Sequence, residues 1–250
     1  MTPALQTNGL GKSFGAFKAN SEISLTVAQG ARHALIGPNG AGKTTFINLL
    51  TGVLPPSAGT IHLNGEDITR VSQQGRVRRG MARTYQINQL FPDLTPLETV
   101  SLAIAERQGT GARFWSRVGS DSAVIDEAEA LLTRMQLGAM MTRRTNTLPY
   151  GKQRLLEIAL AMSCKPKLLL LDEPAAGVPE DERHDVLDSV AALPENVTVL
   201  LIEHDMELVF SFADRISVLV QGMLFAEGPV DEIAGDPRVK AVYLGEDAHV

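Results

Sequence analysis

The residues with the clearest chemical potential form one short stretch, Gly37-Pro38-Asn39-Gly40-Ala41-Gly42-Lys43-Thr44-Thr45, which has the spacing G-x-x-x-x-G-K-[ST]. Glycines at these places let the backbone turn its N–H groups towards an anion, and the start of a following helix adds partial positive charge. The lysine can reach the β and γ oxygens of a polyphosphate, and the next hydroxyl can ligate Mg²⁺. We therefore predict a nucleotide-binding loop over residues 37–45, with Lys43 in catalysis and Thr44 as a metal ligand.

The segments on either side of this loop agree with that interpretation. Ala31 to Ile36 is an apolar run typical of a buried strand, and Thr44 to Leu50 has the apolar spacing of a helix. Strand, glycine loop and helix is the order that the motif requires. The alternative is a glycine-rich turn without a ligand, and the agreement of all the fixed positions with both flanking segments disfavours it.

A second apolar run, Leu168 to Leu171, ends in Asp172, Glu173 and Pro174. Two carboxylates at the end of a buried strand are costly unless something cationic faces them, and Mg²⁺ on a nucleotide is a suitable partner. We predict that Asp172 holds the ion through water and that Glu173 is the general base for the attacking water. The alternative is an acidic turn in which Pro174 only ends the strand.

Size and composition limit the possible architectures and partners. The 250 residues can bury the core of one large domain, or of one domain with a small subdomain. A net charge of −6 and a pI near 5.4 argue against a broad basic surface for nucleic acid. The single cysteine, Cys164, suits a reducing, cytosolic environment. Without an apolar run of about 18 to 20 residues or a targeting segment, we expect a chain that is neither exported nor membrane-spanning.

Periodicity predicts an α/β fold. An early group of strand patterns separated by glycine turns is followed by alternating strands and helices, which indicates a mostly parallel core sheet with an antiparallel β edge subdomain. Residues 94–148 lack a convincing strand, and Ala123 to Leu137 has helical spacing. We expect a helical subdomain over about 94–162 and a core over about 1–93 and 163–250. Within the helical part, residues 108–122 are rich in Gly and Ser and predict a flexible excursion.

Read together, these motifs and four further segments resemble an ATP-binding cassette (ABC) ATPase, a P-loop NTPase, over nearly the whole chain. Gln86 follows the strand pattern 81–85 and matches the family's Q-loop, and His204 follows the pattern 197–202 and matches the switch histidine. Phe14 matches the aromatic residue that stacks on adenine. Taken singly, each has a plain alternative: a strand-end amide, a helix-start residue and a core aromatic. The fourth segment resembles the family's LSGGQ signature, with Pro149, Tyr150, Gly151, Lys152 and Gln153 at its centre.

The resemblance implies ATP and Mg²⁺ as cofactors and a role for each matching residue. Gln86 is implied to ligate the metal, together with Thr44 and Asp172, and to couple the nucleotide to the helical subdomain. His204 is implied to bond the γ-phosphate. The signature is implied to press on ATP held by a second ATPase subunit, so that ATP-driven closure of the dimer moves membrane-embedded partners.

Two residues depart from the family pattern. Pro149 stands where the signature serine would donate a hydroxyl to phosphate, so we expect backbone N–H groups near Tyr150 and Gly151 to carry that contact. Pro179 stands where the family usually has the D-loop aspartate. The acidic residues Glu180 and Asp181 that follow it are expected to start a helix.

Four segments indicate a branch of the family: residues 80–86, 172–177, 202–206 and 242–246 are similar to the ATPases of branched-chain amino acid uptake systems, whose relatives handle amides and urea. This similarity implies an importer with a homologous second ATPase, two permease subunits and, indirectly, a substrate-binding protein. The chain would then lie peripherally on the cytoplasmic face of the inner or plasma membrane.

Two alternatives remain open. One is the ATPase of lipopolysaccharide export, which has a similar Tyr-Leu-Gly segment near its end. The other is a non-transport ABC protein acting on nucleic acid, for which Arg76, Arg78, Arg79 and Arg83 could argue. We interpret these arginines as a solvated face or a permease contact, and we expect no nucleic-acid partner.

Overall fold

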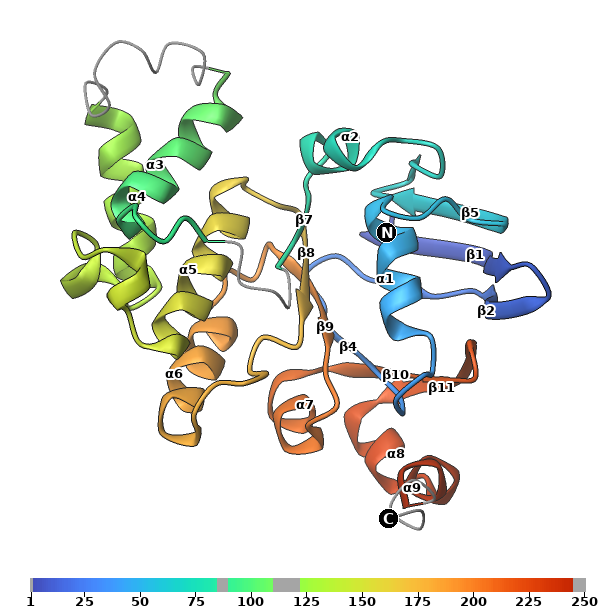
Figure 1. Cartoon of the computed structure of the whole chain (residues 1–250). Coiled ribbons are helices and arrows are strands. Elements are labelled where there is room, and N and C mark those ends of the chain that lie inside the picture. The colour runs from blue at the N-terminus through green and yellow to red at the C-terminus, as the bar shows by residue number, and fades with distance from the viewer. Residues whose placement is uncertain (1, 85–89, 110–121, 245–250) are drawn as a thin grey trace. The chain divides into compact units, whose positions relative to one another are not determined.

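The computed structural model describes residues 2–84, 90–109 and 122–244, which divide into two compact units (Figure 1). The first unit is formed by Met1–Arg83, Lys167–Glu173 and Pro194–Val250. The second is formed by Thr84–Pro166 and Pro174–Leu193. The subdomain boundaries expected near residues 93 and 163 stay a prediction.

The larger sheet of the first unit is the mostly parallel core predicted from the sequence. Its described strands run in the order β11-β10-β4-β9-β8-β7, and all neighbours are parallel except the antiparallel pair β10 and β11. The central strands β8 and β9 are buried at every residue and are apolar except for Asp172 and Thr198, as is typical of parallel strands covered on both faces. The bounds are β4 Arg32–Ile36, β7 Met81–Arg83, β8 Leu168–Asp172, β9 Thr198–Ile202, β10 Arg215–Val220 and β11 Met223–Pro229.

A smaller antiparallel sheet forms the expected edge region. Its order is β2-β1-β5-β6, with β3 paired to β1, and Figure 1 shows β1, β2 and β5 side by side. Tight turns join β1 to β2 and β5 to β6, and Gly15 and Gly65 supply the positive φ that these turns need. The bounds are β1 Leu5–Phe14, β2 Phe17–Ile23, β3 Thr26–Val27, β5 Ala58–Leu63 and β6 Glu66–Asp67.

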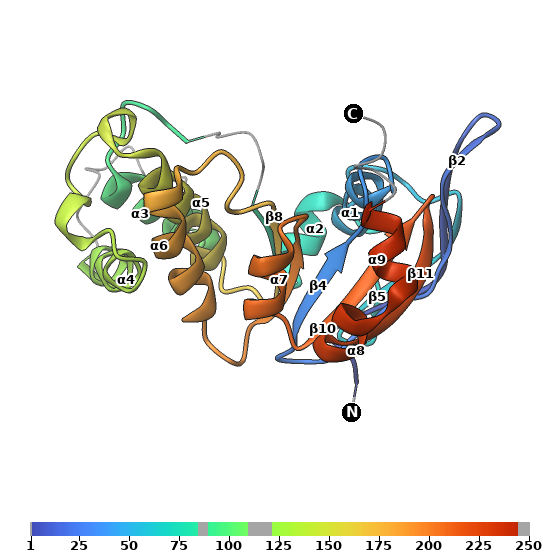
Figure 2. The ribbon, with the colours of Figure 1, turned by 90° about the horizontal axis from the view of Figure 1, so that it is seen from below.

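Two hydrophobic clusters lie on opposite faces of the larger sheet, because successive residues of a strand point to opposite sides. Leu35 of β4 belongs to the cluster that contains helix α1 (Lys43–Thr51) and the inner residues of the smaller sheet. Its neighbours Ala34 and Ile36 belong to the cluster that contains α7 (Met206–Phe212), α8 (Val230–Gly235) and α9 (Pro237–Leu244). Figure 2 shows α8 and α9 beside β10 and β11.

The helix α2 (Gln73–Arg78) corrects one interpretation of the sequence. The arginines near residue 80 do not form one solvated face, because Arg76 is buried and donates from Nη1 to the carbonyl oxygens of Leu49 and Leu50, each at 2.6 Å. These carbonyls lie in the last turn of α1, where positive charge is favoured. Burial lowers the pKa of Arg76. Arg76 is therefore a structural residue.

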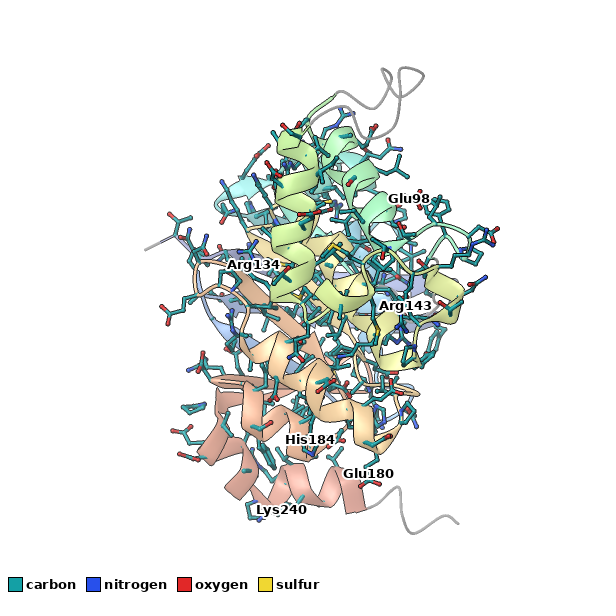
Figure 3. The ribbon with its side chains drawn as sticks, turned by 90° about the vertical axis from the view of Figure 1, so that its left-hand side faces the viewer. Glu98, Arg134, Arg143, Glu180, His184 and Lys240 are labelled. Atoms are coloured by element: carbon teal, nitrogen blue, oxygen red, sulfur yellow. The ribbon has the colours of Figure 1, made fainter. Side chains whose placement is uncertain are left out.

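The second unit is helical in its described residues. Helix α3 (Pro96–Arg107) starts at a capping box in which Thr95 and Glu98 bond each other's backbone N–H groups. It packs against α4 (Ser122–Arg134) and α5 (Tyr150–Ser163), and α5 packs against α6 (Glu180–Ala191). Charged side chains such as Glu98, Arg134 and Glu180 are exposed on the helices (Figure 3). As expected, α6 begins with acidic residues. Two short 3₁₀ turns, Gly138–Met140 and Thr145–Thr147, precede α5.

None of the helices within residues 2–84, 90–109 and 122–244 combines the length and the apolar character needed to cross a membrane.

Candidate functional site

The phosphate loop follows β4 directly and leads into α1, in the order that the sequence predicts. Gly42 is the N-cap residue of α1 with φ 97°, and a Cβ there would lie 2.6 Å from the Ala19 carbonyl oxygen. A Cβ on Gly37 would lie 2.2 Å from the Leu219 carbonyl oxygen. At both positions another part of the backbone occupies the space of a side chain, so only glycine fits. The loop is thus packed closely against its surroundings.

The Lys43 ammonium group folds back onto the loop. It donates to the carbonyl oxygen of Gly37 and, at 3.1 Å, to that of Pro38, and Lys43 as a whole is 9% exposed. Asn39 and Gly40 are exposed, Ala41 is buried, and Thr44 and Thr45 occupy the first turn of α1. The loop backbone and the start of α1 therefore form an arrangement that suits an anionic ligand.

Two residues that sequence reasoning missed hold this loop from outside. Asn20 of β2 is buried and donates from Nδ2 to the Gly42 carbonyl oxygen at 3.2 Å. Gly222, in the β10–β11 turn, donates its N–H to the Ala41 carbonyl at 2.9 Å and accepts from Ser21 at 2.8 Å. A Cβ on Gly222 would lie 2.4 Å from the Ala19 carbonyl oxygen. Only the tight turn between two strand patterns could have singled out Gly222 in the sequence.

Asp172 ends β8, as predicted, and is buried. Its Oδ2 accepts from Nη2 of Arg83 at 2.7 Å, and Nη1 of Arg83 donates to Oδ1 of Asn48 at 2.8 Å. Arg83 ends β7, the neighbour of β8, and its side chain is 10% exposed. The interpretation of Arg83 as part of a solvated face is therefore also wrong. This arginine bridges the predicted metal ligand Asp172 and the helix that carries Thr44.

Glu173 and His204 meet just beyond the carboxyl ends of β8 and β9. Glu173 adopts a left-handed conformation with φ 47°, and its N–H donates to the Ile202 carbonyl at 2.9 Å. This sparsely populated conformation is uncommon for a side chain of this size and is typical of functional sites. The Glu173 Oε1 and the His204 Nδ1 are 3.6 Å apart, and the His204 side chain is 62% exposed. Glu203, beside His204, is buried.

Phe14 is exposed at the end of β1, so it is not the core aromatic that was its plain alternative. Phe17 of β2 lies opposite it in the strand pairing and is also exposed. The Lys12 ammonium group lies 5.3 Å from the centre of the Phe14 ring. Two exposed aromatic rings on one hairpin can stack on a planar base. Sequence reasoning found only the first of them.

The predicted Mg²⁺ ligands Thr44 and Asp172 both offer oxygen atoms. Mg²⁺ prefers oxygen ligands and usually keeps several waters, so it needs only one or two protein groups beside phosphate oxygens. Thr44 on α1 and Asp172 on β8 offer a hydroxyl and a carboxylate, and the Asn48–Arg83–Asp172 contacts tie these two elements together. The residues present therefore fit Mg²⁺. Gln86, the third predicted ligand, lies outside the described residues.

The signature segment lies at the start of α5 in the second unit. Pro149 is the N-cap residue and gives no side-chain cap, and Tyr150 begins the helix. The Gly151 N–H donates to Oε2 of Glu182 at 2.6 Å, and the Lys152 ammonium pairs with Asp185 at 2.8 Å. A carboxylate of α6 thus occupies a position at the α5 N-terminus where an anion is favoured.

The rest of the signature makes contacts within the second unit. Gln153 donates from Nε2 to the Leu148 carbonyl at 2.9 Å. The Arg154 guanidinium lies 5.3 Å from the centre of the Tyr150 ring and donates to the Tyr150 hydroxyl at 3.0 Å. The start of α5 is therefore tied to its own unit, and the Gly151 N–H already has an acceptor in Glu182. The expected contact of backbone N–H groups near Tyr150 and Gly151 with phosphate stays a prediction.

Comparison with protein families gives two matches. Residues 20–176 match the family described as ABC transporter, and residues 224–249 match the one described as branched-chain amino acid ATP-binding cassette transporter. The second match covers the C-terminal segment that includes most of β11, and α8 and α9.

Individual proteins resemble the chain over nearly its whole length. It is 39% identical to the high-affinity branched-chain amino acid transport ATP-binding protein BraF of Pseudomonas aeruginosa and 40% identical to the corresponding LivG of Salmonella typhimurium. Each match covers 98% of this chain and 98% of the relative. Among solved structures, an ABC transporter ATP-binding cassette in its ADP conformation is 30% identical, with a TM-score of 0.86 and coverage of 98% of this chain and 100% of that chain.

Proposed function

The chain belongs to the ATP-binding cassette family of transporter ATPases, and from this membership we propose that it powers an importer of branched-chain amino acids or of related small polar solutes such as amides and urea. The observation that carries the proposal is the set of groups at the carboxyl ends of β4, β8 and β9: the phosphate loop, the carboxylates Asp172 and Glu173, and His204. Ligands of parallel α/β sheets bind at this edge.

In this proposal the loop N–H groups and the start of α1 bind the phosphates of ATP. Lys43 exchanges its loop carbonyl partners for phosphate oxygens, where its charge stabilises the transferring group. Thr44, Asp172 and Gln86 would hold Mg²⁺, which when bound neutralises charge on the β and γ phosphate oxygens. Phe14, with Phe17 beside it, offers a surface on which the adenine can stack.

Hydrolysis in this proposal depends on Glu173 and His204. Glu173 orients the attacking water and accepts its proton, and its backbone conformation is held by the bond to Ile202. His204 reaches the γ-phosphate from a position 3.6 Å from the Glu173 carboxylate. The pair can therefore position water and stabilise the developing charge from one side of the phosphate.

We infer that the active assembly contains a second ATPase subunit, two permease subunits and a substrate-binding protein, with this chain lying peripherally on the cytoplasmic face of the membrane. The signature residues Pro149, Tyr150, Gly151, Lys152 and Gln153 would then meet ATP bound by the other ATPase subunit. The match at residues 224–249 supports the amino acid branch over lipopolysaccharide export and over a nucleic-acid machine.

The variant Glu173→Gln tests the hydrolytic mechanism. Because the amide cannot accept a proton, we expect ATP turnover to fall by about 10²-fold or more while ATP affinity, measured by calorimetry, stays near that of the unmodified protein. ATP should then accumulate unhydrolysed on the variant.

The matched control is Glu195→Gln. Glu195 is exposed and precedes β9, so it lies at the opposite end of that strand from His204. Its replacement should leave turnover unchanged. Hydrolysis by Glu173→Gln at the unmodified rate would rule out Glu173 as the base.

To test the transport role, uptake of leucine, acetamide and urea should be measured with the cognate permeases in vesicles. Uptake of none of the three would contradict it.

A further inference from the structure

We propose that Arg83 is a positioning residue that serves as the internal counter-ion of Asp172, supplying positive charge there while the metal ion is absent. This inference rests on the proposed function, because it assumes that ATP with Mg²⁺ binds beside Asp172. It adds a residue to which the sequence motifs assign no role in the site, since Arg83 precedes the Q-loop residue by three positions.

The first observation is the geometry of the Arg83 guanidinium. One arm, Nη2, donates to Oδ2 of Asp172 at 2.7 Å, and the other, Nη1, donates to Oδ1 of Asn48 at 2.8 Å. The planar fork of arginine makes two such bonds in fixed directions, which a lysine cannot do. The carboxylate is therefore held in one orientation by a rigid group, and that group is itself oriented by α1.

The second observation is burial. The Asp172 side chain is 3% exposed and that of Arg83 is 10% exposed. A buried carboxylate without a nearby positive charge is strongly unfavourable, and its repulsion of an incoming polyphosphate is poorly screened by solvent. Arg83 offsets both effects before any metal ion arrives.

The third observation is the place of Asn48 on α1. It follows Thr44 by four residues, so the two side chains lie on the same face of the helix, one turn apart. Arg83 therefore links, through its two hydrogen bonds, the face of α1 that carries Thr44 to the carboxylate of Asp172. Thr44 and Asp172 are two of the predicted metal ligands. A cation bound between Thr44 and Asp172 would take over the role of Arg83 as the positive neighbour of that carboxylate.

A counter-ion and a purely structural arginine predict different effects on ATP binding with and without Mg²⁺. Without the Arg83 charge, ATP alone must approach a carboxylate that has lost a positive neighbour 2.7 Å away, whereas ATP with Mg²⁺ brings its own compensating charge. Loss of Arg83 should therefore weaken metal-free ATP binding more than Mg²⁺-dependent binding. We define the metal gain as the ATP affinity measured with Mg²⁺ divided by the ATP affinity measured without it. The metal gain should therefore increase when Arg83 is lost.

The test is isothermal titration calorimetry of ATP into the full chain, with excess EDTA and with Mg²⁺. For Arg83→Gln we expect the metal gain to rise by about tenfold, as the loss of one charge neighbour near a buried site implies. The matched control is Arg79→Gln, because Arg79 pairs with Glu66 on the surface, with side chains 37% and 57% exposed. Its metal gain should equal that of the unmodified protein.

Three outcomes are decisive. An equal loss of affinity with and without Mg²⁺, or a smaller metal gain, would mean that Arg83 has only a structural role and would overturn the proposal. A larger metal gain in Arg79→Gln as well would also overturn it. If the unmodified protein does not bind ATP under either condition, the proposed function itself fails, so the two failures are distinguishable.

If Arg83→Gln does not fold, two variants with smaller changes allow the same measurement. Arg83→Lys keeps the charge and loses the fork, so its metal gain should stay within about twofold of the unmodified value. Asn48→Ala keeps the arginine but removes one acceptor that orients it, so its metal gain should rise by less than that of Arg83→Gln. No change in Asn48→Ala, together with an increased gain in Arg83→Lys, would contradict the proposal.

Discussion

Gly42 shows how a single residue can set the shape of the phosphate loop. Its φ of 97° is unfavourable for any residue with a Cβ, and such a Cβ would also lie 2.6 Å from the Ala19 carbonyl and 2.7 Å from the Asn20 amide nitrogen. The surrounding atoms belong to backbone and to a buried side chain, so they cannot easily move. Strain and steric overlap therefore act together at this residue.

We predict that Gly42→Ala lowers the free energy of unfolding by about 3 kcal/mol, which exceeds the roughly 1 kcal/mol expected from a left-handed conformation alone. Urea denaturation without nucleotide measures this change. Gly40→Ala is the matched control, because Gly40 has φ 76° and no atom within 4 Å of an added Cβ. Equal losses for the two variants would show that the overlap with β2 contributes nothing.

At the scale of elements, the start of α5 depends on α6. Pro149 provides no side-chain cap, so the first N–H groups of α5 need other acceptors, and Glu182 provides one for Gly151 at 2.6 Å. A Cβ on Gly151 would lie 2.7 Å from that carboxylate oxygen, so the glycine makes the contact possible. The two helices are thereby joined at the signature segment.

We predict that Glu182→Ala lowers the free energy of unfolding by about 1.5 to 3 kcal/mol, because a charged hydrogen bond at a helix end is lost. Glu180→Ala is the control, since Glu180 lies in the same first turn of α6 and is exposed (Figure 3). Both variants lose the same favourable charge at the start of α6, so the difference in their urea midpoints isolates the Gly151 contact. A difference near zero would show that the contact does not stabilise the protein.

At the scale of the whole molecule, the sequence was informative wherever a residue type is required locally. The phosphate loop, the acidic end of β8 and the mostly parallel core sheet all follow from motif and hydrophobic periodicity, and the fold class is confirmed. The proposed roles of the site residues stay predictions. Periodicity predicts the order of the helices and strands along the chain. It also predicts that the loops following the parallel strands lie at the carboxyl-terminal edge of the sheet.

Contacts between segments that are far apart in the sequence could not be predicted from the sequence. Arg76, Arg79 and Arg83 have similar neighbours in the chain, yet one caps the end of α1, one lies on the surface and one pairs with Asp172. Their different environments come from tertiary packing, which a pattern of charges does not encode. For the same reason Asn20 could not be recognised as a partner of the phosphate loop, and the turn between two strand patterns marks Gly222 without indicating what it contacts.

The buried histidine of β4 couples the stability of the molecule to pH. His33 lies in the sheet with its Nε2 2.8 Å from the Ser217 hydroxyl of β10. Burial, with a smaller contribution from the nearby positive charge of Arg215, lowers its pKa from 6.5 to about 4. The folded protein therefore keeps this imidazole neutral at pH values where the unfolded chain binds a proton. Since the unfolded state binds more protons between these two pKa values, stability falls as the pH decreases through that range.

We predict that His33 contributes a loss of up to about 3 kcal/mol in the free energy of unfolding between about pH 7 and pH 4, the remaining pH dependence coming from other groups. His33→Gln keeps an amide that can bond to Ser217 but does not titrate, so its urea midpoint should vary less with pH over this interval. His184→Gln is the control, because His184 is exposed on α6 (Figure 3) and its removal should leave the pH dependence unchanged. If His33→Gln and the unmodified protein lose stability equally on acidification, the buried imidazole is not the group responsible, and the proton must be taken up elsewhere in the unfolded chain.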